Sequence, residues 1–272
     1  MLAWATDNGA RRRAREECGL RVLRYLRWFA NSLFCYLWTF INSFIATLAL
    51  CLGHQGRASH WVGRRSWAAG MLRFCGIKAT ASGLDNFDPR RPYVFVANHQ
   101  SLFDIPAVFY TNPANLRFIA KKSLFYIPFF GSYLALAGYI ALDRSNRRKA
   151  IASHDRAAEK IRHGVPIISF PEGTRSADGE VRKFKKGAFM LAIKAGVPIV
   201  PVSISGTREV LPKHSLLVRS GRIRIHYDRP VETSDYGVEG RDTLMEKVRQ
   251  TVLANKRLLD AGRIPDGGQR QE

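Results

Sequence analysis

Short apolar runs alternate with amphipathic segments from Ile77 to Leu259. The apolar runs predict β-strands at residues 77–83, 92–97, 116–120, 139–142, 165–170, 197–204 and 222–227. Segments with helical character predict α-helices at 147–163, 187–195 and 241–259, and the apolar segment after Asp104 can continue as another helix. Strands that alternate with helices are typical of an α/β fold, here with a mixed, largely parallel central sheet flanked by helices.

The N-terminal part of the chain has a different pattern, dominated by one long apolar stretch. Trp28–Leu52 spans 25 residues without a charge, which is long enough to cross about 30 Å of hydrocarbon. A buried core helix is the alternative interpretation of such a stretch. Aromatic side chains crowd its first half, however, and this enrichment is typical of a membrane interface.

Positive charge flanks the apolar stretch on both sides, with arginines at 11–27 and basic residues again at 57–78. A single membrane span should leave the strong positive cluster on one side only. The pattern therefore favours a membrane-associated helical hairpin that does not cross the bilayer, whose second arm is an amphipathic helix at 61–75. We expect a basic, membrane-associated two-helix segment at 1–76, an α/β domain at 77–260 that would hold any active site, and a flexible tail at 261–272.

The formal net charge of the 272 residues is +21, and residues 1–80 hold twelve Lys and Arg against three acidic residues. Such a charge suits nucleic acid, an anionic membrane surface or phosphate-bearing substrates. No recognised nucleic-acid-binding module is present, and the basic runs flank an apolar segment, so we expect no nucleic-acid partner. The four cysteines lack metal-binding spacing, which predicts unpaired thiols in a reducing compartment and no metal site.

The segment 98–104, Asn-His-Gln-Ser-Leu-Phe-Asp, follows the predicted strand at 92–97. His99 is a candidate general base because histidine titrates near neutral pH. If the chain turns between them, the carboxylate of Asp104 can bind the far nitrogen of His99, fix its tautomer and stabilise the imidazolium. In the alternative interpretation, Ser101 and Asp104 form a capping box in which Asp replaces Glu, and His99 only ends a strand.

A second motif, Phe-Pro-Glu-Gly-Thr-Arg-Ser at 170–176, follows the predicted strand at 165–170. Ligands of open α/β sheets bind at the carboxyl ends of the strands. Gly173 permits a close approach of the backbone, while Thr174 and Arg175 offer a hydroxyl and a planar guanidinium that suit a phosphate. The alternative is an ordinary Pro–Gly turn with a solvated arginine.

Two further segments carry motifs: Lys121–Gly131 follows the predicted strand at 116–120, and Gly131–Arg144 contains the predicted strand at 139–142. Taken together and in this order, the motifs resemble the glycerolipid acyltransferase family, and most closely its bacterial 1-acyl-sn-glycerol-3-phosphate acyltransferases. The resemblance covers roughly Ile77–Tyr227, and the segments 98–104 and 170–176 are its most specific part. It is weakest in the N-terminal region.

The resemblance implies the glycerol-phosphate acyltransferase fold and a reaction. A fatty acyl group would move from acyl-CoA or acyl carrier protein to the 2-hydroxyl of 1-acyl-sn-glycerol 3-phosphate (lysophosphatidic acid), giving phosphatidic acid for phospholipid biosynthesis. His99 would deprotonate the hydroxyl, Asp104 would orient His99, and the alkoxide would attack the thioester directly. The family needs no metal and no bound cofactor, because the acyl thioester is a cosubstrate.

The resemblance also assigns substrate-binding roles. Lys121 or nearby backbone N–H groups would stabilise the oxyanion of the tetrahedral intermediate. Glu172 would either orient the glycerol or brace its loop. Gly173 and Thr174 would shape the phosphate pocket, and the substrate phosphate would be held by Lys121, Arg144 and Arg175.

Two alternatives stay open at this point. In the first, the chain would be a related acyltransferase that acts on another lysolipid or on glycerol 3-phosphate. In the second, it would be a non-catalytic basic protein that binds membranes. In the second case His99 and Asp104 would have no role. The bacterial resemblance and the basic hairpin predict attachment to the bacterial inner membrane, with the catalytic domain on its cytoplasmic face.

Overall fold

In the computed structural model, residues 2–52, 61–143 and 147–265 are described, and side chains are described for these residues except 2–17, 147–152 and 154. Their strands form one seven-stranded sheet in the order β1-β7-β6-β2-β5-β3-β4. Neighbouring strands are parallel except β6 and β7, which are antiparallel. The strands are β1 (Ile77–Ser82), β2 (Val94–Ala97), β3 (Arg117–Lys121), β4 (Ile140–Leu142), β5 (Ile167–Ser169), β6 (Ile199–Ser205) and β7 (Gly221–Tyr227).

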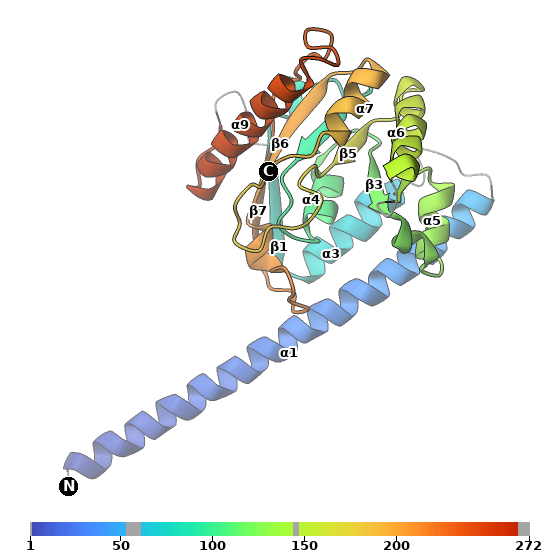
Figure 1. Cartoon of the computed structure of the whole chain (residues 1–272). Helices are drawn as coiled ribbons and strands as arrows, with labels where there is room; N and C mark the ends of the chain where they lie inside the picture. Colours follow the sequence, from blue (N-terminus) through green and yellow to red (C-terminus); the bar gives the residue numbers. More distant parts are fainter. Residues whose placement is uncertain (1, 53–60, 144–146, 266–272) are drawn as a thin grey trace.

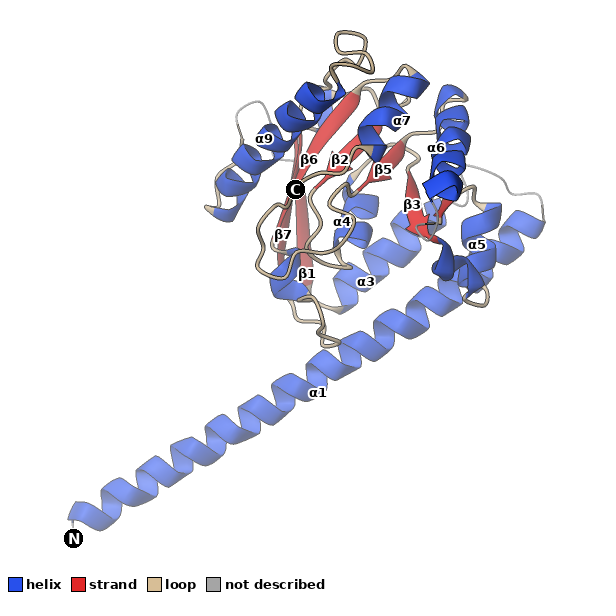
Figure 2. Cartoon of the chain, viewed as in Figure 1, coloured by secondary structure: helices blue, strands red, loops and turns tan. Residues whose placement is uncertain are grey.

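Helices cover both faces of the sheet (Figures 1 and 2). One face packs against α1 (Leu2–Cys51), α3 (Ala69–Phe74), α4 (Asp104–Thr111) and α5 (Phe130–Leu136), and the other against α6 (Arg147–Arg162), α7 (Gly187–Ala195) and α9 (Arg241–Asp260). Strand β2 contributes to both cores: Phe95 faces the first layer of helices, whereas Val94 and Val96 face the second. A strand buried on both faces reads as a continuous apolar run, as it does in this chain.

The predicted mixed, largely parallel sheet is confirmed, with differences at the ends of its elements. Three strands, β2, β5 and β6, begin later than predicted, each after a proline: Pro92, Pro166 and Pro198. Proline has no N–H to donate to a strand ladder, so regular pairing starts beyond it. The sequence pattern did not predict the short elements η2 (Leu84–Asn86), η3 (Lys122–Tyr126), α5 and α8 (Thr207–Val210).

Helix α1 is longer than the predicted first arm, because it begins at Leu2 rather than near Trp28. The predicted second arm forms a π-helical segment, η1 (Val62–Ala68), followed by α3. It runs along α1: the indole N–H of Trp67 donates to Thr39 at 2.9 Å, and the hydroxyl of Ser66 donates to Asn42 at 2.6 Å. The two predicted arms therefore lie side by side.

One side of α1 is apolar and exposed. Leu26, Phe29 and Leu37 are each more than half exposed, whereas Cys35 and Ala46 on the opposite side are buried. Among the described residues, Cys18–Cys51 is the stretch with the length and mean hydropathy (1.7) of a membrane-crossing helix. A contiguous exposed apolar surface of this kind is typical of a membrane or protein interaction site.

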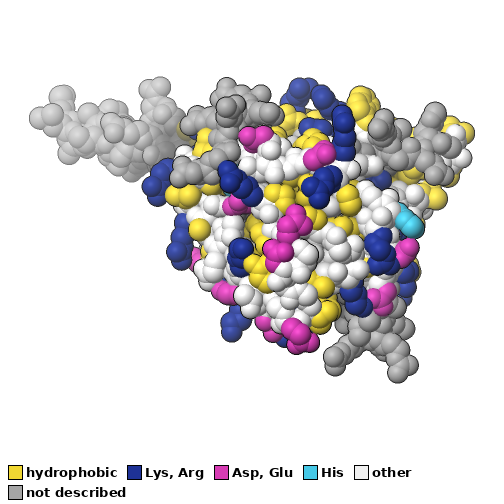
Figure 3. Space-filling view, turned by 90° about the horizontal axis from the view of Figure 1, so that it is seen from above, with side chains coloured by type: hydrophobic (Ala, Val, Ile, Leu, Met, Phe, Trp, Pro, Cys, Tyr) yellow, Lys and Arg dark blue, Asp and Glu magenta, His cyan; other side chains and the backbone are white. Residues whose placement is uncertain are grey.

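On the face of the molecule shown in Figure 3, basic and acidic side chains are interspersed. Exposed ion pairs link the outer helices, such as Lys194 of α7 with Asp155 of α6 at 2.7 Å. Exposed pairs of this kind contribute little to stability. This face therefore shows no single basic patch that would account for the net charge of +21.

Candidate active site

His99 and Asp104 meet at the carboxyl end of β2. The Nδ1 atom of His99 lies 2.7 Å from Oδ2 of Asp104, and the side chains are 16% and 0% exposed. The chain turns between β2 and α4, so residues five apart can face one another. The other imidazole nitrogen, Nε2, makes no hydrogen bond to a described residue. It is therefore the nitrogen that can accept a proton from a bound molecule.

Asp104 also holds the turn that precedes α4. Its Oδ2 atom accepts hydrogen bonds from the backbone N–H groups of Gln100 at 2.8 Å and Ser101 at 3.0 Å. The capping box considered for Ser101 and Asp104 forms only in part. Oδ2 of Asp104 accepts from the N–H of Ser101, but the hydroxyl of Ser101 accepts from the N–H of Phe103, and no side chain caps the start of α4. The second oxygen, Oδ1, is buried and has no partner among the described residues.

Glu172 braces the backbone of His99. Its Oε1 accepts from the N–H of His99 at 2.8 Å, and its Oε2 accepts from the N–H of Arg182 at 3.2 Å. The N–H of Ser176 donates in turn to the carbonyl of His99 at 2.8 Å. Burial raises the pKa of Glu172, although both N–H groups oppose that shift. Of the two roles considered for Glu172, this geometry favours the brace.

The ring of Phe170 stacks on the ring of His99, with 4.4 Å between their centroids. Gly173 has a φ of +73°, in the left-handed region that favours glycine. Thr174 is exposed and Arg175 is half-buried. The guanidinium of Arg175 makes no hydrogen bond or ion pair with a described residue, which leaves its donors available.

Three of the predicted positions lie at one edge of the sheet. β2, β5 and β3 are adjacent and parallel, so their carboxyl ends bring together His99, the segment 170–176 and Lys121. Lys121 is exposed there. Arg144 lies outside the described residues.

Sequence reasoning missed one cation beside this site. The ammonium of Lys185 lies 2.8 Å from the position that a Cβ atom on Gly173 would occupy, and the N–H of Lys185 donates to the carbonyl of Pro171 at 2.9 Å. Its signal in the sequence is the basic run 182–186 after the motif at 170–176. A side chain at position 173 would meet this lysine.

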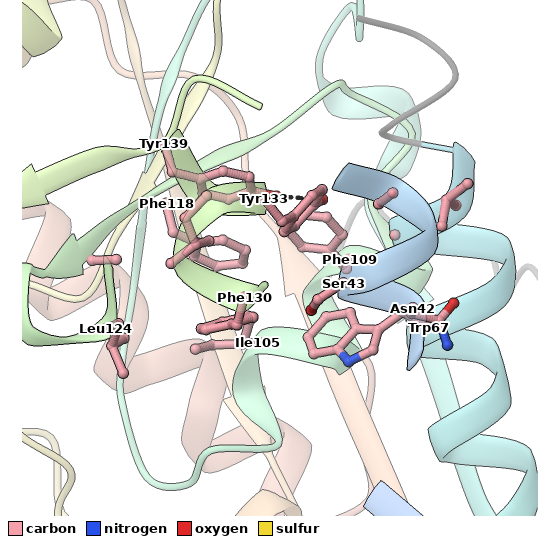
Figure 4. A pocket seen from close by; sticks show the side chains of 15 residues that line it. Asn42, Ser43, Trp67, Ile105, Phe109, Phe118, Leu124, Phe130, Tyr133 and Tyr139 are labelled. Carbon is pink, nitrogen blue, oxygen red and sulfur yellow. Dashed lines mark hydrogen bonds between the residues drawn. The ribbon is translucent and has the colours of Figure 1, made fainter. Parts of the chain in front are cut away.

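An apolar pocket lies on the α1 face of the sheet (Figure 4). Ile105, next to Asp104, forms part of its wall. Phe118 forms another part, and its ring stacks on that of Phe170 with 6.4 Å between the ring centroids. Helix α1 closes one side with three residues, Asn42, Ser43 and Ala46, and η1 adds Val62, Gly63 and Trp67. Aliphatic and aromatic side chains dominate the lining, which suits a hydrocarbon chain.

Within the described parts of the chain, no three His, Cys, Asp or Glu side chains gather in a way that could hold a metal ion.

The chain is similar in sequence and in fold to known acyltransferases. The family model described as "Acyltransferase" matches residues 78–205. Two proteins named 1-acyl-sn-glycerol-3-phosphate acyltransferase are each 34% identical to the chain. The one from Chlamydomonas reinhardtii matches over 241 residues, 87% of this chain and 70% of its own. The one from Saccharomyces cerevisiae matches over 223 residues, which is 80% of this chain and 72% of its own.

A solved structure has the same fold. The crystal structure of the 1-acyl-sn-glycerophosphate (LPA) acyltransferase PlsC from Thermotoga maritima superposes with a TM-score of 0.77 at 28% sequence identity. The match covers 89% of this chain and 98% of that one. It therefore includes most of the N-terminal helical region as well as the sheet.

Proposed function

The chain belongs to the 1-acyl-sn-glycerol-3-phosphate acyltransferase family, and from that premise we propose that it acylates the 2-hydroxyl of lysophosphatidic acid with a fatty acyl thioester. The product is phosphatidic acid. The observation that carries the proposal is the His99–Asp104 pair, joined at 2.7 Å, with Nε2 of His99 available beside an apolar pocket.

The first step is a proton transfer. Nε2 of His99 takes the proton of the 2-hydroxyl, while Oδ2 of Asp104 holds the proton on Nδ1 and stabilises the imidazolium. The alkoxide attacks the thioester carbon, and the tetrahedral intermediate expels the carrier thiolate. The imidazolium then returns its proton to the thiolate. No Ser or Cys nucleophile is required, so no acyl-enzyme forms.

The substrate phosphate lies, in this proposal, at the sheet edge beside the motif at 170–176. The half-buried guanidinium of Arg175 has no partner among the described residues, and Lys121 adds an exposed cation. Lys185 packs against Gly173 and supplies a third. A phosphate monoester carries more than one negative charge near pH 7, and several cations around one anion suit it.

Arg175→Lys is expected to raise KM for lysophosphatidic acid about 10-fold, with little effect on KM for the acyl donor, because lysine loses the two-pronged geometry that matches phosphate oxygens. Steady-state kinetics with each substrate varied in turn measure the two KM values separately. Arg182→Lys on the same loop is the matched control, because the Arg182 backbone, rather than its guanidinium, binds Glu172. Equal rises in both KM values would show that Arg175 does not bind the acceptor.

We assign the apolar pocket to a substrate acyl chain. Phe118 in the pocket wall stacks on Phe170, and Phe170 stacks on His99. The other end of the pocket is lined by residues of α1. A fatty chain has no hydrogen bonds to satisfy, so an apolar lining binds it without a polar penalty.

Ala46→Phe is expected to reduce kcat/KM for an 18-carbon substrate by about 10-fold more than for a 10-carbon substrate, because the added ring occupies the end of the pocket. A panel of acyl-CoA and lysophosphatidic acid chain lengths measures this change and identifies which chain the pocket takes. Leu48→Phe is the control, since Leu48 is 51% exposed and lies on the same helix outside the pocket. An unchanged chain-length profile would remove the assignment.

The N-terminal region is proposed to lie in one leaflet of the bacterial inner membrane, with the catalytic domain on the cytoplasmic face. The exposed apolar side of α1 supports this proposal, as does the polar contact between Ser66 and Asn42 within the two-arm unit. Substrate and product are lipids, so a monotopic enzyme can exchange both laterally.

Single cysteines at positions 8 and 58, in a background without the four native cysteines, test the topology. We expect an impermeant thiol reagent to label both in inside-out inner-membrane vesicles and neither in intact cells, because positive charge flanks both ends of the apolar stretch. Opposite accessibility of the two positions would establish a membrane span and reject the leaflet-limited hairpin.

The function itself is tested with the purified full chain, radiolabelled acyl-CoA or acyl carrier protein, and a panel of acceptors. We expect lysophosphatidic acid to be acylated at its 2-position. Preference for another lysolipid or for glycerol 3-phosphate would reassign the acceptor. No transfer from either donor to any acceptor would favour the non-catalytic membrane-binding alternative.

A further inference from the structure

A second group of exposed apolar side chains lies on the catalytic domain, in the turn between η3 and α5. The four consecutive residues of this turn, Tyr126–Phe129, are all exposed, and Tyr126 is 72% exposed. Runs of exposed apolar residues are unfavourable in water and are kept where they have a function. The proposed acyl transfer gives this turn no role.

The ring of Phe129 joins the turn to the exposed apolar side of α1. It meets the rings of Phe40 and Phe44 edge-on, with 5.1 Å and 5.2 Å between the ring centroids. Phe40 and Phe44 are each nearly half exposed. The hydroxyl of Thr47 donates to the carbonyl of Phe129 at 3.2 Å and strengthens the same contact. The turn and the helix therefore present one continuous apolar surface.

The backbone of Phe129 is strained. Its φ is +60°, in a region that non-glycine residues, and bulky ones above all, rarely adopt. Such a conformation persists where the surrounding contacts hold it. Here two phenylalanine rings and the Thr47 hydroxyl, all from α1, supply those contacts. The helix thus holds the turn in this conformation, with the apolar side chains of the turn exposed.

The turn also lies beside the apolar pocket. Leu124 and Phe130, which flank the turn in the sequence, line the pocket, while Ser43 and Ala46 of α1 form another part of its lining (Figure 4). The exposed apolar surface and the pocket are therefore built from the same two segments of the chain. A hydrocarbon chain held at this surface would lie close to the pocket that we assign to a substrate acyl chain.

The residues around the turn match the boundary between lipid headgroups and acyl chains. Tyrosine is enriched at that boundary because its ring is apolar and its hydroxyl is polar, and lysine extends its charge toward the headgroups. Tyr126 begins the turn, and the exposed Lys121 and Lys122 precede it. Lys122 pairs with Asp143 at 3.3 Å, whereas Lys121 makes no ion pair with a described residue. Beside a helix with the length and hydropathy of a membrane-crossing one, this order of residues favours a lipid surface over a protein partner.

We propose that the turn at 126–129 inserts into the same leaflet as α1, with its side chains among the upper acyl segments of the lipids. The inference rests on the proposed membrane attachment of α1 and adds a contact made by the catalytic domain itself. A protein held by one interfacial helix can roll about that helix, and a second contact beside it prevents this motion. The pocket then stays next to hydrocarbon, so a lipid chain enters it sideways from the leaflet without passing through water.

Depth-dependent fluorescence quenching tests the insertion without requiring turnover. Tyr126→Cys and Ile127→Cys are made singly in the full chain without its four native cysteines, labelled with an environment-sensitive dye and bound to vesicles that contain phosphatidylglycerol. We expect the emission to shift to the blue, and lipids with a spin label high on the acyl chain to quench most of it. Leu37→Cys, on the exposed side of α1, reports the attachment of the helix itself. Val238→Cys is the matched control, because Val238 is 52% exposed and precedes α9, on the other face of the sheet.

Quenching at positions 126, 127 and 37, but not at 238, would support the proposal. Quenching at position 37 alone would overturn it and leave the attachment of α1 standing. Quenching at none of the four positions would overturn both. Equal quenching at position 238 would also overturn it, because the domain would then enter the lipid without preference for this turn. None of these results depends on acyl transfer, so a failure of the activity assay is a separate finding.

Discussion

Replacing His99 by alanine is expected to lower kcat by at least ~100-fold, the usual scale for loss of a general base. The imidazole is the group at this sheet edge that can take the hydroxyl proton, and Nδ1 is already committed to Asp104. Steady-state turnover with lysophosphatidic acid and an acyl thioester measures the effect. The fold should persist, because the brace from Glu172 binds the backbone of residue 99 rather than its side chain.

The matched control for this prediction is His163→Ala. His163 is a histidine on the surface whose side chain is 74% exposed, and it pairs with Glu159. That variant should retain wild-type turnover. Near wild-type turnover in His99→Ala, in a protein with an unchanged unfolding temperature, would rule out direct attack assisted by this residue.

Asp104→Asn is expected to lower kcat by at least ~100-fold as well, because a neutral amide cannot stabilise the imidazolium that forms during proton transfer. The geometry lets this substitution remove the charge while it keeps the hydrogen-bond acceptor. All three donors, from His99, Gln100 and Ser101, converge on Oδ2, while Oδ1 has no partner among the described residues. The asparagine oxygen can therefore replace Oδ2, with the amide nitrogen in the position of Oδ1.

Asp104→Ala separates the two roles of this carboxylate. It removes the acceptor for two buried N–H groups as well as the charge, so we expect it to lower the unfolding temperature by several degrees, since unsatisfied buried donors cost about 1–3 kcal/mol each. Asp104→Asn keeps the acceptor for those N–H groups, so it should lower the unfolding temperature less than Asp104→Ala does. Retained activity in a folded Asp104→Asn protein would contradict an electrostatic role.

Local sequence patterns were enough to predict the sheet and the contact between His99 and Asp104. The apolar runs identify the strands, and the strand–turn–helix junction around His99 and Asp104 is local in the chain. The antiparallel direction of β7 depends on how the chain between β6 and β7 turns. Apolar periodicity is the same for a parallel and an antiparallel buried strand, so the pattern of residues does not contain that information.

Contacts between distant segments were beyond the reach of sequence reasoning. The brace from Glu172 to the N–H of His99 joins residues 73 positions apart. Lys185 reaches Gly173 only because the loop after Pro171 folds back on itself. Asn31 of α1 donates to the carbonyl of Val218, so one of the polar residues in the apolar stretch serves the loop before β7.

The shared hydrophobic core of α1 and the sheet has a practical consequence. Cys35 and Leu50 of α1 belong to the same buried cluster as Phe95 and Ile223 of the strands. We therefore expect α1 and the sheet to fold as one cooperative unit. Washing with salt or alkali, which strips loosely held proteins from bilayers, should leave such a protein behind. A shortened chain starting at Ile77 would expose the apolar surface that α1 covers, and we expect it to aggregate before it could be purified.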